Sequence, residues 1–190
     1  MAESLGFQGG LDFWFGPEPH RFRPEWFQKD AAFDAAIRAR FLATQERAAR
    51  CALHGWSATA HGALALVIVL NQFSRNLFRD DARAFATDAH ARRITTDAIA
   101  RGFDRALPPI ARMFLCLPFE HSESLADQER SVALFESIED PGVRDAVLPY
   151  AVRHRDIIRR FGRFPHRNRV LGRTSTPAER AFLSTPSASF

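Results

Sequence analysis

The chain has 190 residues, 46% of them apolar, which is enough for one domain with a substantial buried core. Its most apolar run, residues 63–70, is far shorter than the ~20 residues that a membrane span needs, and the N-terminus lacks the pattern of a signal peptide. Two cysteines and a modest net charge of +4 favour a cytoplasmic protein that has neither a membrane nor a nucleic acid as its main partner.

The first quarter of the chain predicts a short aromatic helix and then a long one. Residues 11–16 read as a helix or turn that places aromatic rings in the core, and a Pro-rich loop follows. Asp30 is a good N-cap for a helix over residues 31–50. The inward stripe of that helix is expected to contain Phe33, Ile37, Phe41, Ala48 and Cys51.

The next helix is apolar on all sides, which predicts a central position in the fold. Thr59 or Ser57 is expected to cap it, and residues 63–70 form its apolar body. Polar residues follow directly, and buried polar groups need partners. These residues therefore form either a solvated helix end or part of a binding site, and the candidates are Asn71, Gln72, Arg75 and Asn76.

Three further helices are expected in the middle of the chain. Asp80 or Asp81 would cap a helix that ends at Arg101, with Gly102 closing it. A second helix would begin at Pro108–Pro109 and end at Leu117, because Pro118 stops it. A third would begin after Ser122 or Ser124 and end at Ile138, and its inward positions would be Leu125, Val132 and Phe135.

Asp140, Pro141 and Gly142 are expected to start a helix that continues to Phe161 and has a histidine on its apolar face. Val143, Val147, Tyr150, His154, Ile157, Ile158 and Phe161 recur at helical spacing. Gly162 supplies the left-handed residue that ends such a helix. Near the end of the chain, Thr176 and Glu179 match a capping box for a short helix, and a frayed tail is expected from about residue 184.

No segment has the alternating pattern of a strand, so we predict an all-α fold without a sheet. Helices joined by short Pro or Gly turns favour antiparallel pairs in a single domain over residues 1–190, with about eight or nine helices in total. No clean repeat period is present in the sequence, so a solenoid is allowed without being indicated.

Residues 154–168 carry the densest group of polar side chains. From residue 150 to 173 there are eight arginines and one acid, Asp156, which favours an anionic partner or acidic faces elsewhere in the fold. His154 and Asp156 point to different sides of a helix, so they cannot share one metal ion. Motifs for nucleotides, zinc and serine hydrolases are missing, and we expect neither a cofactor nor a metal.

These residues suggest a pocket that accepts a small carboxylate or phosphate. The candidate catalytic residues are His154, His121 and Asp127, with Asp127 or Glu123 as the acid beside His154. The candidate ligand-binding residues are Asn71, Gln72, Arg75, Asn76, Arg163, His166, Arg167 and Asn168. Alternatives are a structural network without a ligand, a groove for an acidic peptide, and RNA stacking on Phe161 and Phe164.

Several segments, in order over residues 11–183, resemble one bacterial family, the domain of unknown function with serial number 924. They include Asn71–Asn76, Leu117–Glu123 and His154–Asn168. The resemblance implies an all-helical, tetratricopeptide-like superhelix and implies no activity. The family pattern has Asp at the position of Asn71 and an apolar residue at that of Glu120, and Asn71 cannot act as a carboxylate base.

Overall fold

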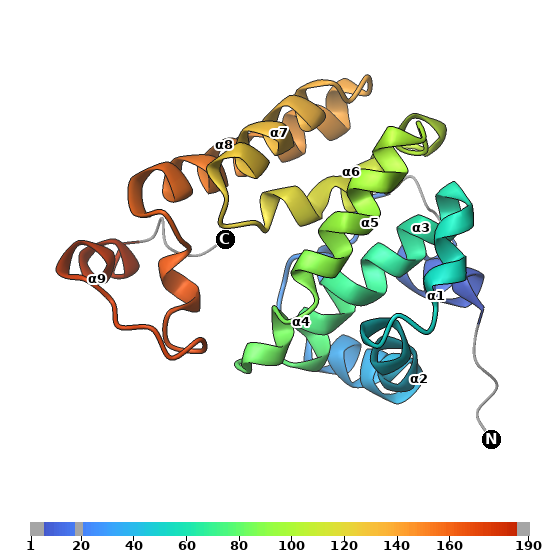
Figure 1. The fold of residues 1–190 in the computed structure, drawn as a ribbon, viewed down its shortest axis with the longest axis horizontal. Coiled ribbons are helices and arrows are strands. Elements are labelled where there is room, and N and C mark those ends of the chain that lie inside the picture. Colours follow the sequence, from blue (N-terminus) through green and yellow to red (C-terminus); the bar gives the residue numbers. More distant parts are fainter. Residues whose placement is uncertain (1–5, 18–20, 186–190) are drawn as a thin grey trace. The chain divides into compact units, whose positions relative to one another are not determined.

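The computed structural model of the protein describes residues 6–17 and 21–185, which form two compact units (Figure 1). The first unit falls within residues 1–79 and 83–118, and the second within residues 80–82 and 119–190. The main boundary between the units lies inside one helix, between Pro118 and Phe119. The expectation of a single folding domain stays a prediction.

Both units are helical, and no strand occurs in residues 6–17 or 21–185. The helices of the first unit are α1 (Phe7–Phe15), α2 (Ala31–Ala49), α3 (Ala60–Val67), α4 (Ser74–Leu77), α5 (Asp88–Ala100) and most of α6 (Pro109–Glu120). The second unit holds the last turn of α6, then α7 (Leu125–Glu136), α8 (Pro141–Phe161) and α9 (Pro177–Leu183). The predicted all-α fold is confirmed, whereas the superhelical stacking of helix pairs stays a prediction.

The first unit is built around packed aromatic rings. Trp14 of α1 is completely buried, and its ring centroid lies 5.3 Å from that of Phe114 and 5.7 Å from that of Phe73. The ring centroid of Phe41 in α2 lies 4.8 Å from that of Phe73. Such contacts add to the free energy of burial, and they account for a sequence with 18 phenylalanines and a single tyrosine.

The predicted caps of α2 and α3 are present. The Asp30 carboxylate accepts hydrogen bonds from two backbone N–H groups in the first turn of α2, and the Thr59 hydroxyl accepts one from Gly62. Position 62 requires a glycine, because a Cβ there would lie 2.0 Å from the carbonyl oxygen of Trp56. The residues of α3 from Gly62 onward are buried, as predicted for a central helix.

The chain does not end its helix at the polar residues after Leu70, as one interpretation of the sequence expected. It continues as a π-helix, Ile68–Phe73, and then as α4. Asn71 and Gln72 are both buried in the π-helical turn. A π-turn inserts one residue into the helical register, so polar side chains after it point in directions that a regular period does not predict.

Two predicted helix boundaries were wrong, the start of α5 and the end of α6. The helix expected after Asp80 or Asp81 begins only at Asp88, because residues 82–84 form a short 3-10 helix and Asp80 has a left-handed φ of 60°. Helix α6 passes through Pro118 and ends at Glu120. A proline so near a helix end removes only one hydrogen bond, and the complete burial of Phe119 offsets that loss.

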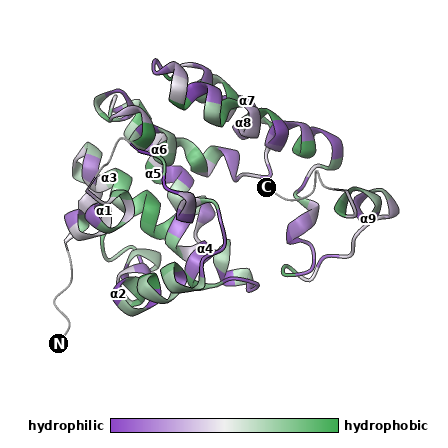
Figure 2. Ribbon diagram, turned by 180° about the vertical axis from the view of Figure 1, so that it is seen from behind, coloured by the Kyte–Doolittle hydropathy of each residue, from purple (hydrophilic) through white to green (hydrophobic). Residues whose placement is uncertain are grey.

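In the second unit, α7 and α8 form a pair joined by a short turn, and they lie side by side (Figure 1). Asp140 caps α8 and Gly162 ends it with a left-handed φ of 69°, both as predicted. Apolar and polar residues are mixed along both helices, as expected for amphipathic elements (Figure 2). The predicted capping box between Thr176 and Glu179 begins α9.

Three residues expected in the core are on the surface. Tyr150 is 55% exposed, because the buried stripe of α8 passes through Ala151 and leaves its neighbour about 100° to the side. Leu125 is 39% exposed in the first turn of α7, where few residues cover the helix. Cys51 is exposed because the chain turns away from α2 there with a φ of 61°, whereas the other cysteine, Cys116, is buried.

Residues 6–17 and 21–185 contain no helix that is both long and apolar enough to cross a membrane. Only the first two residues of the predicted frayed tail, 184 and 185, fall within the described part of the chain. Ser184 follows α9 as its C-cap residue, and residues 186–190, where the frayed tail was expected, lie outside the described part.

Candidate functional site

His154 points into the second unit, as its helical spacing predicted. It is 8% exposed, and its Nδ1 donates a hydrogen bond of 2.9 Å to the carbonyl oxygen of Tyr150 one turn earlier. The ring of His121 lies 6.4 Å from that of His154, centroid to centroid, so the chain brings these two candidate catalytic residues together. Their catalytic roles stay predictions.

The acid beside His154 is Glu120, which the sequence interpretation did not consider. Its Oε1 lies 3.6 Å from His154 Nδ1, and the residue is only 5% exposed. Burial disfavours the charged form and raises the pKa of this carboxyl from its ordinary value near 4.5 to about 8. Glu120 is therefore mostly protonated at neutral pH, and its Oε2 has no hydrogen bond within the described residues.

The two acids expected beside His154 make other contacts. Asp127 accepts a hydrogen bond of 2.6 Å from the Ser122 hydroxyl. Glu123 accepts two hydrogen bonds from Arg173 and one from the backbone N–H of Phe164, which hold the pKa of its carboxyl below its ordinary value against the effect of burial. Glu123 thus anchors the segment after α8, a role that its position in the sequence did not indicate.

Arg163 is held in a bidentate ion pair rather than pointing into an open site. Its guanidinium donates to both carboxylate oxygens of Glu179, at 2.6 and 2.9 Å, and also to the carbonyl oxygen of Thr174. The hydrogen bond from Arg163 is the main cause that lowers the pKa of Glu179 to about 2. This geometry fastens α9 to the end of α8, and a ligand-binding role for Arg163 stays a prediction.

The remaining candidates of this unit lie in the segment after Phe164. Arg167 is 6% exposed, donates a hydrogen bond of 3.0 Å to the carbonyl oxygen of His121, and places its guanidinium over the ring of Phe164. Asn168 is 1% exposed and donates to the Ser175 hydroxyl. His166 is exposed, with its ring 5.6 Å from that of Phe164.

The other candidate ligand-binding residues form a polar network in the first unit, centred on Asp88 of α5. Arg75 makes two hydrogen bonds to the Asp88 carboxylate, at 2.8 and 2.9 Å, and Asn71 donates a third at 3.0 Å. Gln72 donates to Asn71, while Asn76 donates to Asp34 of α2. Because this network and the histidine cluster belong to different units, their meeting in one site stays a prediction.

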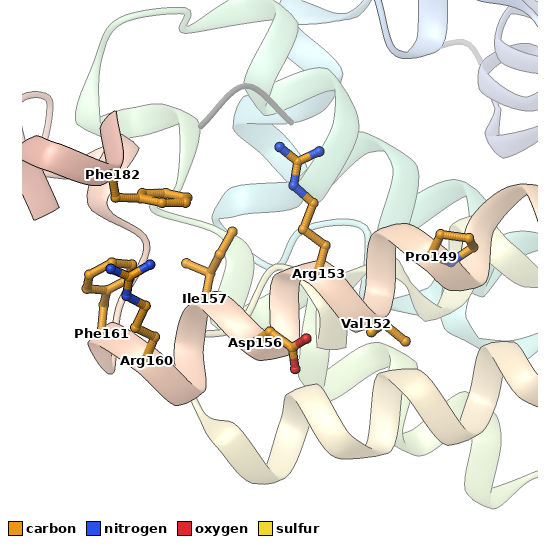
Figure 3. A pocket seen from close by; sticks show the side chains of 8 residues that line it. All are labelled: Pro149, Val152, Arg153, Asp156, Ile157, Arg160, Phe161 and Phe182. Carbon is orange, nitrogen blue, oxygen red and sulfur yellow. The ribbon is translucent and has the colours of Figure 1, made fainter. Parts of the chain in front are cut away.

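A pocket of about 400 Å³ lies beside α8 within the second unit. It is lined by Pro149, Val152, Arg153, Asp156, Ile157, Arg160, Phe161 and Phe182. Phe182 of α9 faces Ile157 and Phe161 of α8, and Arg153 and Arg160 extend from the same helix (Figure 3). None of the residues predicted as site residues lines this pocket.

Most arginines of the 150–173 stretch are engaged by acids, and Arg160 is an exception. Arg155 and Arg159 both donate to Asp156, and Arg173 pairs with Glu123. Arg160 is exposed, its guanidinium lies over the Phe161 ring at 4.7 Å from the centroid, and it forms no ion pair with any residue that the structure describes. The pocket therefore combines an apolar wall with the exposed guanidinium of Arg160.

Helical spacing could have revealed this pocket. Arg153, Ile157 and Arg160 recur at intervals of four and three, which places them on one face of α8. What the sequence could not supply is Phe182, whose contact with this face depends on how the chain returns after Gly162. Three or more His, Cys, Asp or Glu side chains arranged to hold a metal ion are not found in residues 6–17 or 21–185.

The fold and the pocket define an all-helical protein with an amphipathic, positively charged hollow beside a C-terminal helix. Residues 11–187 match the model of a family described as bacterial protein of unknown function (DUF924), and the chain belongs to that family. A solved structure of a protein of unknown function, ATU0120 from Agrobacterium tumefaciens, is similar, with 43% identity and a TM-score of 0.84. The similarity covers 94% of this chain and 96% of that one. The comparison with curated proteins gives no match.

Proposed function

We propose that the protein binds a small organic anion, a carboxylate or a phosphate, in the pocket between α8 and α9. The observation that supports this proposal is the exposed guanidinium of Arg160 at an apolar hollow, with Arg153 on the same wall. A guanidinium is a planar fork of N–H donors that matches the oxygen atoms of carboxylates and phosphates. A volume of about 400 Å³ is in the range of small-molecule sites.

Binding, rather than a reaction, is what the pocket residues can provide. The lining contains no Ser, Cys, His or Lys side chain, so it offers none of the common nucleophiles except the Asp156 carboxylate, which two neighbouring arginines engage. The apolar wall and the cationic groups together would orient a ligand that has one charged end. The histidine cluster around His154 is a separate feature of α8, because His154 does not line the pocket.

Thermal unfolding in the presence of different anions tests this function. A ligand that binds only the native state raises the unfolding temperature, by about 3–6 °C at tenfold excess over its Kd for a chain of this size. We expect carboxylates or phosphates to stabilise the wild type in a chloride buffer and the Arg160→Gln variant to lose most of that effect. Arg144→Gln is the matched control, because Arg144 lies on the same helix and pairs with Asp145, and neither residue lines the pocket.

The proposal fails if no anion of either class stabilises the wild type. It also fails if Arg160→Gln responds as the wild type does, because the stabilisation must then arise elsewhere. Equal losses in Arg160→Gln and Arg144→Gln would mean that only the general positive charge of α8 is sensed, and this result too would contradict a specific pocket.

A further inference from the structure

Resting on the proposed function, we infer that the ligand of the α8–α9 pocket is a monocarboxylate with a hydrocarbon tail, rather than a phosphate. Three features of the pocket carry this inference: its aromatic wall, the acid on its rim and the orientation of Arg160. Each restricts the ligand in a different way.

The aromatic wall favours a ligand with an apolar part. The rings of Phe161 and Phe182 lie 5.2 Å apart at an interplanar angle of 47°, and both are only partly buried. Ile157 lies beside them, in the same small apolar cluster. Rings that retain exposed surface in a hollow gain free energy when a hydrocarbon group covers them. Inorganic phosphate and acetate cannot supply such a group.

The acid on the rim sets the charge that the pocket tolerates. Asp156 lines the pocket, and its side chain is 54% exposed. Hydrogen bonds from Arg155 and Arg159 offset much of its charge without removing the carboxylate from the rim. A monoanion bound at Arg153 and Arg160 brings one negative charge near the Asp156 carboxylate. A phosphate dianion brings two, so its electrostatic repulsion from Asp156 is about twice as large. Asp156 therefore favours a carboxylate over a phosphate.

The position of Arg160 favours planar recognition. Its guanidinium carbon lies over the Phe161 ring, 4.7 Å from the ring centroid. The N–H groups of the guanidinium can donate two parallel hydrogen bonds to a carboxylate. A carboxylate bound there would lie next to the aromatic wall, so that a tail of a few carbon atoms would reach Phe182.

A titration series tests the inference by isothermal calorimetry in a chloride buffer. The ligands are acetate, hexanoate, 3-phenylpropanoate, inorganic phosphate and hexylamine. We expect hexanoate and 3-phenylpropanoate to bind at least about tenfold more tightly than acetate, because each fully buried methylene is worth roughly threefold to fourfold in affinity. Phosphate should bind more weakly than hexanoate, and hexylamine should not bind.

Two variants separate the role of the wall from that of the acid. Phe182→Ala should reduce hexanoate affinity to nearly that of acetate, whereas Phe182→Leu keeps an apolar side chain and should retain most of it. Circular dichroism checks that both variants keep their helical content. Asp156→Asn should improve phosphate binding by a larger factor than hexanoate binding, because the removed charge repels a dianion about twice as strongly as a monoanion.

The outcomes distinguish this inference from the proposed function. If either phosphate or acetate binds as tightly as hexanoate, the inference of a monocarboxylate with a hydrocarbon tail is wrong, while anion binding stands. If none of the anions binds, the proposed function itself fails. If Phe182→Ala and Phe182→Leu both bind hexanoate as the wild type does, the tail does not lie against α9 and the inference is overturned.

Discussion

At the scale of single residues, Glu120 illustrates what burial does to an ionisable group. It follows the fully buried Phe119 at the end of α6 and faces His154 Nδ1 at 3.6 Å. The imidazole already donates its Nδ1 hydrogen to a backbone carbonyl, so Glu120 receives little compensation for its lost hydration. Its pKa therefore rises to about 8, and the folded protein holds a proton that the unfolded chain would release.

This raised pKa predicts a specific dependence of stability on pH. Between pH 4.5 and 8 the native state binds one more proton at Glu120 than the unfolded state does, so the free energy of unfolding falls as the pH rises through this window. Glutamine resembles the protonated acid and cannot ionise. Glu120→Gln should therefore gain on the order of 2–4 kcal/mol relative to the wild type between pH 5 and pH 8.

Urea unfolding at a series of pH values measures this difference. Glu136→Gln serves as the control, because Glu136 is exposed on α7 and its removal should leave the slope unchanged. Parallel pH profiles for the wild type and Glu120→Gln would mean that Glu120 is ionised in the native protein, contrary to its burial without a compensating hydrogen bond.

The contrast between His154 and Tyr150 shows how far sequence alone reaches at this scale. A helical period correctly placed His154 on the inner face, because a three-to-four spacing determines direction within about one position. It could not separate Tyr150 from Ala151, since neighbouring positions both fit the stripe. Nor could it find Glu120, whose partner lies on another helix and depends on how the end of α6 approaches α8.

At the scale of elements, α9 is the part of the second unit most dependent on one ion pair. It is only seven residues long, too short to be stable as an isolated helix. Its capping box orients Glu179, and Glu179 in turn holds Arg163 at the end of α8. Because Phe182 belongs to this helix, the apolar wall of the pocket depends on the same pair.

Removing the Glu179 carboxylate should therefore loosen α9 without unfolding α8. The pKa of Glu179 is lowered to about 2, so its stabilising effect is fully present above pH 4.5 and is lost as the pH falls toward 2. For Glu179→Gln at pH 7 we expect amide hydrogen exchange in residues 180–183 to become at least about tenfold faster. Exchange in the middle of α8 should stay as in the wild type.

Hydrogen-exchange mass spectrometry at pH 7 makes this comparison, and Glu136→Gln is again a suitable control. Unchanged protection of α9 in Glu179→Gln would mean that apolar contacts of Phe182, and not the ion pair, hold the helix. Equal loss of protection in α8 and α9 would show that the pair supports the whole unit.

Local signals predicted some element ends well and others poorly. Asp30, Thr59, Asp140 and Thr176 start helices where the sequence placed them, because an N-cap acts through hydrogen bonds within a few residues. Helix α5 starts late, after the 3-10 helix at residues 82–84, and its first residue Asp88 binds Asn71 and Arg75, which lie 17 and 13 residues away. The π-helical turn at Ile68–Phe73 has no known local signature, so spacing alone could not reveal it.

At the scale of the whole molecule, the helical fold and the family follow from the sequence, whereas the candidate site does so only in part. The arginine-rich stretch includes the part of α8 that lines the proposed pocket, but several of its arginines form structural ion pairs. Arg163 and Arg173 pair with acids 16 and 50 residues away, which only the folded chain reveals. Arg160 belongs to neither of these pairs and lines the pocket.

Occupancy of the α8–α9 pocket by an organic anion is the central claim, and a nuclear Overhauser measurement tests it most directly. With isoleucine methyl groups labelled with carbon-13, hexanoate protons should show intermolecular contacts to Ile157, which lines the pocket, and none to Ile94 of the first unit. The same contacts should disappear in Arg160→Gln at equal ligand concentration. Contacts to other isoleucines without Ile157, or contacts to Ile157 that survive in Arg160→Gln, would contradict the claim.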